Sequence, residues 1–299
     1  MGRSVTSARA LDLRLPSPLE ELRDDRLATA GVRLLLKRDD LISPDIPGNK
    51  WRKLKYNLES ARKQGHQVLL TFGGAYSNHI RATAAAGYYF GFSTVGIIRG
   101  EEHLPLNPSL DYAVRHGMRL AYVDRARYRE KMSPELTTML RGEFGDFYLL
   151  PEGGSNADAV RGCAEIPAEI DRRFDLICCP CGTGGTLAGL AHGLGPAQNA
   201  LGFSVLKGGD FLTGDVARLQ HEAFGTVPGN WSIELGFHFG GFAKRKPELD
   251  RFIADFEERH ALSLDWVYVA KMMFGIFTLA ERGFFSSGAT VVAVITGRE

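Results

Sequence analysis

The sequence predicts an α/β protein with two lobes, each a mostly parallel, twisted sheet flanked by helices. Short apolar runs typical of buried strands alternate with helical segments, and glycine-containing turns join many of them. A chain of 299 residues is long enough for two lobes. Turn-rich stretches at 44–48 and 151–154 are the candidate crossings between the lobes, and a site between two lobes is the usual arrangement.

The hydrophobic pattern between these crossings predicts strands that alternate with helices. Lys50 follows a Pro-Gly turn and is expected to open a helix that runs towards Leu58. The apolar run Val68–Phe72 ends in two glycines and is typical of a buried strand. Small residues then favour a helix at 77–88, a second helix is expected at 110–116, and further strands at 94–98, 119–123 and 147–150.

The rest of the chain repeats this pattern. Leu176–Pro180 is an apolar run that leads into a glycine-rich turn and a helix towards Leu194, and Thr290–Thr296 is an almost wholly apolar closing strand. A strand is also expected at 203–206, with helices at 215–224, 247–260 and 271–282. The expected domains are a large one, 1–47 with 155–299, and a small α/β one, 48–154.

Charge and composition exclude several kinds of partner. Lys and Arg total 36 against 35 for Asp and Glu, so no basic field points to nucleic acid. No apolar run approaches a membrane span, and the N-terminus lacks the apolar stretch of a secretion signal. The four cysteines are poorly placed for disulfides, since three lie at 178–181, and a reducing cytoplasm is therefore expected.

Cys178 and Cys181 form a C-x-x-C pair. A zinc site would need a second pair, and only Cys163 remains while the histidines are scattered, so we expect no metal. The pair could be redox-active, or these cysteines could simply fill a buried strand as small apolar residues.

Lys50 and two glycine-rich turns are the candidates for chemistry. Most lysines are solvated, whereas one that forms covalent bonds must be partly desolvated or close to other cations. Gly182–Thr186 follows a strand and precedes a helix, so its N–H groups and hydroxyls could cradle a phosphate monoester, or the turn could serve only packing. It is neither a Walker A loop nor a dinucleotide fingerprint.

The turn after Val68–Phe72 repeats this design. Ser77 is a good helix N-cap, with Asn78 and His79 in the first helical turn, and such a terminus either binds a carboxylate or is a simple cap. A reactive lysine, a phosphate cradle and a carboxylate cradle together are the inventory of a pyridoxal 5'-phosphate enzyme acting on an amino acid.

At these residues the chain resembles the D-cysteine desulfhydrase and 1-aminocyclopropane-1-carboxylate deaminase family, within the tryptophan-synthase-β-like, fold-type II pyridoxal-phosphate enzymes. The similarity runs nearly end to end. The segments that carry it are Lys37–Asp40, Pro47–Leu54, Gly73–Arg81, Pro151–Asn156, Gly182–Gly189, Leu206–Gly209, Val267–Gly275 and Ile295–Gly297.

The resemblance implies a role for each candidate residue. Lys50 would form the Schiff base and move the α-proton, and Ser77 with neighbouring N–H groups, including that of His79, would take the substrate carboxylate. Asn78 would bind the cofactor's phenolic oxygen. The remaining cofactor contacts would come from Gly182, Thr183, Gly184, Gly185 and Thr186 at the phosphate and from Thr296 at the pyridine nitrogen. Tyr268 would stand over the ring as a second acid/base or as a steering group.

Three departures from the family pattern concern the substrate pocket. Tyr76 replaces the usual glutamine, and Phe242 stands where an active-site tyrosine is usual. Val269-Ala270 replace the Thr-Gly of desulfhydrases and the Glu-Gly of the cyclopropane deaminases. The missing glutamate argues against cyclopropane ring opening.

The implied activity is a lyase or deaminase that eliminates a β-substituent from a small amino acid, D-cysteine-like substrates being favoured, and releases a keto acid with ammonia. Racemisation, β-replacement in a specialised pathway, 1-aminocyclopropane-1-carboxylate deamination and a non-catalytic binder are the alternatives. A homodimer is implied, with a small amino acid as ligand and neither nucleic acid nor membrane as partner.

Overall fold

The computed structural model describes residues 11–46 and 48–297, so that Pro47 of the Pro47–Leu54 segment and the N-terminal residues 1–10 lie outside the described part. The chain forms two compact units. The small unit contains Ser43–Gly154 with the described residues of Met1–Leu13, and the large unit contains Arg14–Ile42 and Ser155–Glu299 as far as it is described. The expected boundaries at 48 and 154 stay a prediction.

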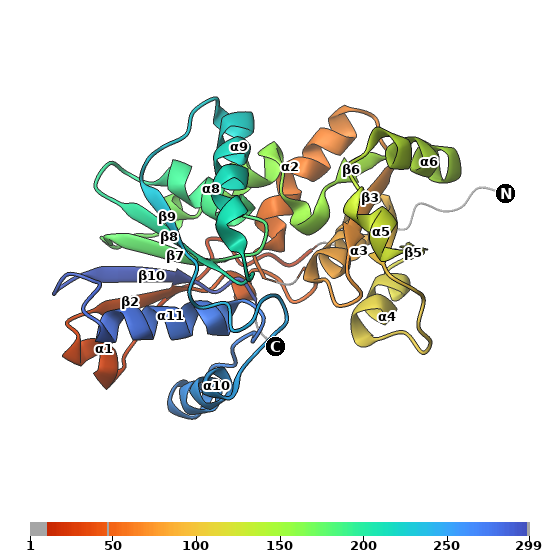
Figure 1. Ribbon diagram of the computed structural model, residues 1–299. Helices are drawn as coiled ribbons and strands as arrows, with labels where there is room; N and C mark the ends of the chain where they lie inside the picture. Colours follow the sequence, from red (N-terminus) through yellow and green to blue (C-terminus); the bar gives the residue numbers. More distant parts are fainter. Residues whose placement is uncertain (1–10, 47, 298–299) are drawn as a thin grey trace. The chain divides into compact units, whose positions relative to one another are not determined.

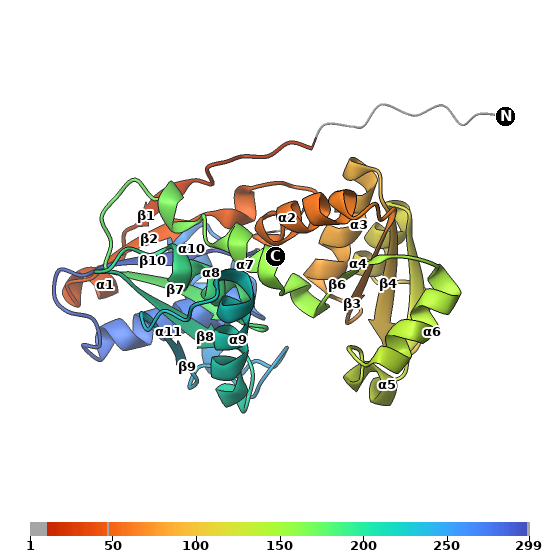
Figure 2. The same ribbon diagram turned by 90° about the horizontal axis from the view of Figure 1, so that it is seen from above.

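The small unit is built on a four-stranded parallel sheet in the order β5-β4-β3-β6. Apolar side chains of α2, α3 and α4 pack on one face, and those of α5 and α6 on the other. Figure 2 shows α3 and α6 on opposite sides of this sheet. Its elements are α2 (Lys50–Lys63), β3 (Val68–Gly73), α3 (Asn78–Phe90), β4 (Ser93–Arg99), α4 (Pro108–Arg115), β5 (Met118–Val123), α5 (Arg125–Arg129), α6 (Pro134–Phe144), β6 (Tyr148–Leu150) and the short helix η2 (Glu152–Gly154).

The large unit is built on a six-stranded sheet in the order β1-β2-β10-β7-β8-β9, parallel except for the β1–β2 pair. Its strands are β1 (Leu19–Leu22), β2 (Arg33–Lys37), β7 (Leu176–Cys181), β8 (Asn199–Ser204), β9 (Trp231–Glu234) and β10 (Thr290–Val294). Its helices are α1 (Asp25–Thr29), η1 (Asp39–Leu41), α7 (Ala157–Cys163), η3 (Pro167–Glu169), α8 (Gly185–Gly193), η4 (Gly209–Phe211), α9 (Leu212–Phe224), α10 (Pro247–His260) and α11 (Val269–Glu281).

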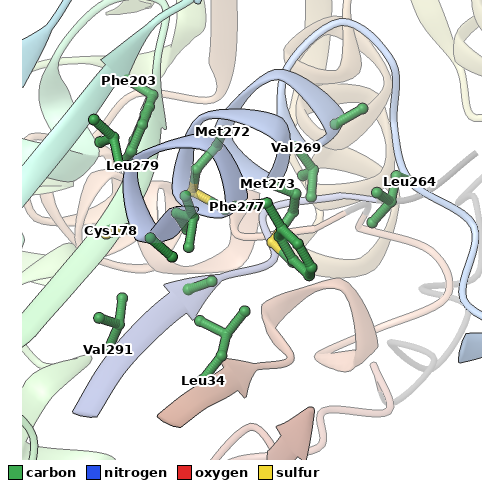
Figure 3. Close-up of a cluster of buried hydrophobic side chains, with 14 of the residues drawn as sticks. Leu34, Cys178, Phe203, Leu264, Val269, Met272, Met273, Phe277, Leu279 and Val291 are labelled. Atoms are coloured by element: carbon green, nitrogen blue, oxygen red, sulfur yellow. The ribbon is translucent and has the colours of Figure 1, made fainter. Parts of the chain in front are cut away.

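Two hydrophobic cores cover the faces of the large sheet, with α8 and α9 on one side and α11 on the other (Figure 1). Figure 3 shows the second core, in which Met272, Met273 and Phe277 of α11 lie above Leu34 and Val291 of strands β2 and β10. Burial of both faces explains why the central strands are continuous apolar runs.

The expected α/β class with mostly parallel sheets is confirmed. One strand was misplaced: the sequence predicts 203–206, whereas β8 spans Asn199–Ser204. Gly202, in the middle of β8, interrupts the apolar pattern by which a strand is recognised in the sequence. Glycine is needed at this position because a methyl group there would lie 2.6 Å from both Cys181 Sγ and Leu187 Cδ2. The glycine thus lets neighbouring side chains approach the strand.

The four cysteines all lie in the described part of the chain, where they are buried and form no disulfide bond. Cys178 belongs to the core under α11, and Cys179 and Cys181 belong to the opposite core, in line with the alternation of a strand. Burial raises the pKa of the Cys178 thiol well above its ordinary value, and a thiol that keeps its proton is a poor nucleophile. Packing as small apolar residues accounts for them.

Across residues 11–46 and 48–297, no helix is long and apolar enough to cross a membrane. In the same ranges no group of three or more His, Cys, Asp or Glu side chains is arranged to hold a metal ion.

Candidate active site

Lys50 is the first residue of α2, directly after a turn in which Gly48 has a φ of 62°. Its side chain is half-buried, and its Nζ donates a hydrogen bond to Oδ1 of the buried Asn49 at 3.1 Å. One turn further along, the buried Lys53 donates to the carbonyl of Gly153 at 3.0 Å. Partial burial close to a second cation is the environment in which a lysine amine can act as a nucleophile.

The turn between β3 and α3 presents Ser77 at a helix N-terminus. Its Oγ accepts hydrogen bonds from the backbone N–H groups of His79 at 3.2 Å and Ile80 at 3.4 Å, which leaves its own proton to be donated. Gly73 makes this possible, because a methyl group there would lie 2.9 Å from Ser77 Oγ and 2.5 Å from Ile80 Cγ1. With Asn78 as the first helical residue, this terminus suits a carboxylate.

His79 is buried, and its ring is held in one protonation state. Thr71 Oγ1 donates to the carbonyl of Leu150 at 2.9 Å, so it must accept from His79 Nε2, which lies 2.9 Å away. His79 Nδ1 is therefore an acceptor, and it has no hydrogen-bond partner within the described residues. Burial, and then the charges of Lys50 and Lys53, lower the pKa of His79 to about 3. The ring is neutral at physiological pH.

Tyr76 directly precedes Ser77, and its side chain is 76% exposed. The small unit therefore holds five of the predicted residues at the carboxyl end of β3 and the start of α2, and Tyr76 projects into solvent from that group. Their proposed contacts with substrate remain predictions.

The turn between β7 and α8 has the form of an anion cradle. It contains Gly182–Thr186, and α8 begins at Gly185, so the N–H groups at the N-terminus of this helix face the turn. Gly184 has a φ of 75°, and a methyl group there would lie 2.7 Å from Val216 Cγ2. Only glycine meets both constraints without strain.

Two aromatic side chains lie next to this cradle. A methyl group on Gly182 would lie 3.0 Å from Cε1 of Tyr268, so the tyrosine ring contacts the glycine backbone directly. The ring of Phe242 meets that of Tyr268 edge to face, with 5.9 Å between the centroids. These contacts join three predicted residues that are distant in the sequence.

Thr296 follows β10, which is the strand beside β7. The register pairs Ala293 with Cys178, so three residues further along Thr296 is level with Cys181 at the entrance to the cradle. The large unit thus holds the predicted phosphate residues, Tyr268, Phe242 and Thr296 at the carboxyl ends of its central strands, where α/β sheets bind ligands.

Sequence reasoning missed Ser155. Its Oγ lies 2.6 Å from Thr183 Oγ1, so it fixes the hydroxyl of a cradle residue. The signal was present, since Ser155 directly follows the turn-rich stretch at 151–154, but turn composition alone does not say which hydroxyl the serine meets.

These residues fit a phosphate ester attached to a flat ring. The cradle provides backbone donors with no side chain in the way, Thr183 and Thr186 add hydroxyls, and the tyrosine ring limits the space above Gly182. A fold with two parallel-sheet units and such a cradle defines the tryptophan-synthase-β-like class of cofactor enzymes.

Comparison with known proteins gives the family. Residues 11–297 match the family described as pyridoxal-phosphate dependent enzyme, and the chain belongs to this family. It is similar to a D-cysteine desulfhydrase of Yersinia enterocolitica, with 28% identity over 305 residues, 94% of this chain and 91% of the relative. A bifunctional D-cysteine desulfhydrase/1-aminocyclopropane-1-carboxylate deaminase of Arabidopsis thaliana is 29% identical over 284 residues, 88% of this chain and 71% of the relative.

Solved structures agree with this assignment. The crystal structure of an ACC deaminase homologue has a TM-score of 0.82 at 28% identity, covering 97% of this chain and 91% of its own. A cysteine synthase of Entamoeba histolytica shares the fold, with a TM-score of 0.73 at 14% identity, over 100% of this chain and 90% of its own. The expected family, enzyme class and pyridoxal-phosphate dependence are confirmed.

Proposed function

We propose that this enzyme is a lyase that removes the α-proton and a β-substituent from a small amino acid, with D-cysteine or a related β-substituted D-amino acid as substrate. The observation that carries the proposal is that Lys50 and Ser77 both lie next to His79 in the small unit. The charge of Lys50 contributes to the lowered pKa of His79, and the backbone N–H of His79 donates to Ser77 Oγ. A candidate base and a candidate carboxylate site therefore lie at the same end of one sheet. The names of the relatives support the same substrate class.

Each side chain has a defined part in this proposal. The N–H groups of 182–186 would hold the phosphate, Asn78 the phenolic oxygen, and Thr296 would place a neutral hydroxyl at the pyridine nitrogen. Ser77, donating its proton, would hold the substrate carboxylate. When bound, the cofactor supplies an electron-accepting ring that stabilises negative charge at the substrate's α-carbon.

Proton movement would then fall to two groups. Lys50 Nζ takes the α-proton, and Tyr268 Oη is placed beside the cradle to donate a proton to the departing β-substituent or to exclude water. Loss of hydrogen sulfide from cysteine leaves an unsaturated amino acid, which water converts to pyruvate and ammonia. A neutral hydroxyl at the pyridine nitrogen makes the ring a milder electron sink, which suits elimination better than transamination.

The departures from the family pattern shape the choice of substrate. Val269 is fully buried in the core below α11, so this position offers no carboxylate for opening a cyclopropane ring. Phe242 is 48% exposed next to Tyr268 and presents no hydroxyl. Without this hydroxyl, two other outcomes remain candidates: racemisation, in which the β-substituent is retained, and β-replacement, in which it is exchanged.

The test begins with protein purified in the presence of pyridoxal phosphate. Borohydride reduction followed by peptide mass spectrometry is expected to find the cofactor on Lys50, and D-cysteine is expected to yield pyruvate, ammonia and sulfide. Lys50→Ala should lose the label and the turnover, whereas Lys63→Ala, an exposed lysine of the same helix, should keep both. Full turnover by Lys50→Ala would refute the proposal. Deuterium exchange at Cα without ammonia would establish racemisation.

The quaternary structure and location belong to the same proposal. The family resemblance supports a homodimer, which light scattering on a sizing column would test. The four cysteines are buried and form no disulfide bond in the described structure, which supports a reducing compartment, namely the cytoplasm.

A further inference from the structure

Lys271 is a fully buried cation in α11, three residues after Tyr268. Its Nζ donates to two backbone carbonyls, those of His238 at 3.0 Å and Gly241 at 2.8 Å. A buried ammonium is costly to desolvate, so hydrogen bonds must compensate for this cost and a specific role is expected for the group. Both acceptors belong to one short loop, residues 238–243.

This loop has an unusual backbone. Phe239, Gly240, Gly241 and Ala243 have φ values of 54°, 101°, 119° and 49°. For the phenylalanine and the alanine this is a disfavoured conformation that persists only where surrounding contacts enforce it. Phe239 has such a contact, because its ring packs edge to face on Phe274 with 4.9 Å between the centroids. Lys271 holds the loop at two points, His238 and Gly241.

The second half of the loop carries Phe242. Its ring projects from between Gly241 and Ala243 and meets the ring of Tyr268, which in turn contacts Gly182 of the cradle. The segment 268–271 therefore provides both the tyrosine of the site and the ammonium that binds the carbonyl of Gly241, the residue directly before Phe242.

We propose that Lys271 is a positioning residue: by binding the carbonyls of His238 and Gly241 it holds loop 238–243 so that Phe242 packs against Tyr268 and forms one wall of the substrate pocket. The statement about the substrate pocket rests on the proposed function, whereas the restraint on the loop does not. The ligand of this wall is the apolar part of a small amino acid, since Phe242 offers no hydrogen bond.

The carbonyls would not be left without donors if the lysine were replaced. His238 O also accepts from Gly241 N at 3.0 Å, and Gly241 O accepts from Lys244 N at 3.1 Å. Methionine would fill the volume of the lysine stem without its charge. Lys271→Met should therefore lose loop order and catalytic efficiency while keeping its thermal stability, which separates positioning from a purely structural role.

The experiment compares holoenzymes with wild-type, Lys271→Met, Phe242→Ala and doubly substituted sequences, and uses Lys244→Met, an exposed lysine of the same segment, as the matched control. Hydrogen–deuterium exchange of residues 238–243 is expected to quicken in Lys271→Met and not in Lys244→Met. For D-cysteine, kcat/KM should fall roughly tenfold or more in Lys271→Met, as for a lost charged hydrogen bond. The double variant should be no worse than the more impaired single variant.

Three results would overturn the inference: unchanged exchange in the loop, additive losses in the double variant, or a melting temperature that falls in parallel with activity. If the wild-type enzyme turned over no amino acid, the proposed function would fail. The exchange measurement would still decide whether Lys271 restrains the loop.

Discussion

Replacing His79 by glutamine should make the protein less sensitive to acid. The His79 ring is buried, and its Nε2 donates to Thr71, a bond that a glutamine side-chain amide can also make. The substitution thus removes a titratable group and keeps its donor. Because two lysine charges and burial act on the imidazole, the folded protein resists its protonation.

The expected size follows from the pKa values. The ordinary pKa of histidine is 6.5 and the pKa of His79 is about 3, so between these values the unfolded chain binds a proton that the folded chain does not. Stability is therefore fully present above pH 6.5 and is lost as the pH falls towards 3. From pH 6.5 to pH 4 this is about 2.5 pH units, which corresponds to about 3 kcal/mol of unfolding free energy.

The assay is urea unfolding of the cofactor-free proteins at pH 7 and pH 4. Between the two pH values the wild type should lose about 3 kcal/mol more than His79→Gln, because all other groups titrate alike in both. His103→Gln, which alters an exposed histidine of the small unit, should follow the wild type. Equal losses in wild type and His79→Gln would refute the argument that His79 is buried and neutral.

Three further substitutions test other parts of the structure. Gly184→Ala forces a methyl group towards Val216 at a positive φ, so it should cost about 1–2 kcal/mol and release the cofactor on dialysis, as followed by visible absorbance; unchanged retention would contradict the cradle. Gly189→Ala places a methyl group 2.5 Å from Val160 O and should lower the melting temperature by separating α7 from α8, at a cost of about 1–3 kcal/mol; a melting temperature equal to that of the wild type would contradict this packing. Burial lowers the pKa of Lys271 from 10.5 to about 8, so between these pH values the unfolded chain binds a proton that the folded chain does not. The unfolding free energy of the wild type relative to that of Lys271→Met should therefore rise from pH 8 to pH 10. If urea titrations found the same difference at both pH values, they would argue against the buried charge.

Local sequence predicted those parts of the fold and site whose physics is local. The turn at 182–186 was recognisable because a strand, glycines and a helix follow one another, and Ser77 because an N-cap acts within three residues. The mostly parallel pairing of the strands followed from apolar runs alternating with helices, whereas their order in each sheet was not predicted.

Features that depend on distant contacts were not predictable in this way. The edge strand β9 and the short β1 carry little apolar signal, since both are only partly buried. The contact of Tyr268 with Gly182, and the bonds of Lys271 to loop 238–243, join segments that only tertiary packing brings together. Likewise, His79 looks like a surface residue of a helix start until Thr71 and Leu150 enclose it.

The strand order of the large sheet has a consequence for how the protein is made. β10 pairs on one side with β2 and on the other with β7, so the strand translated last among those described is a central one. Until it emerges from the ribosome, the β1–β2 pair has no neighbour on the inner edge of β2, whereas the small unit, which ends at Gly154, has already been translated. The inner edges of β2 and β7 in the nascent large unit therefore stay unpaired until translation reaches β10, and unpaired strand edges are prone to wrong pairing.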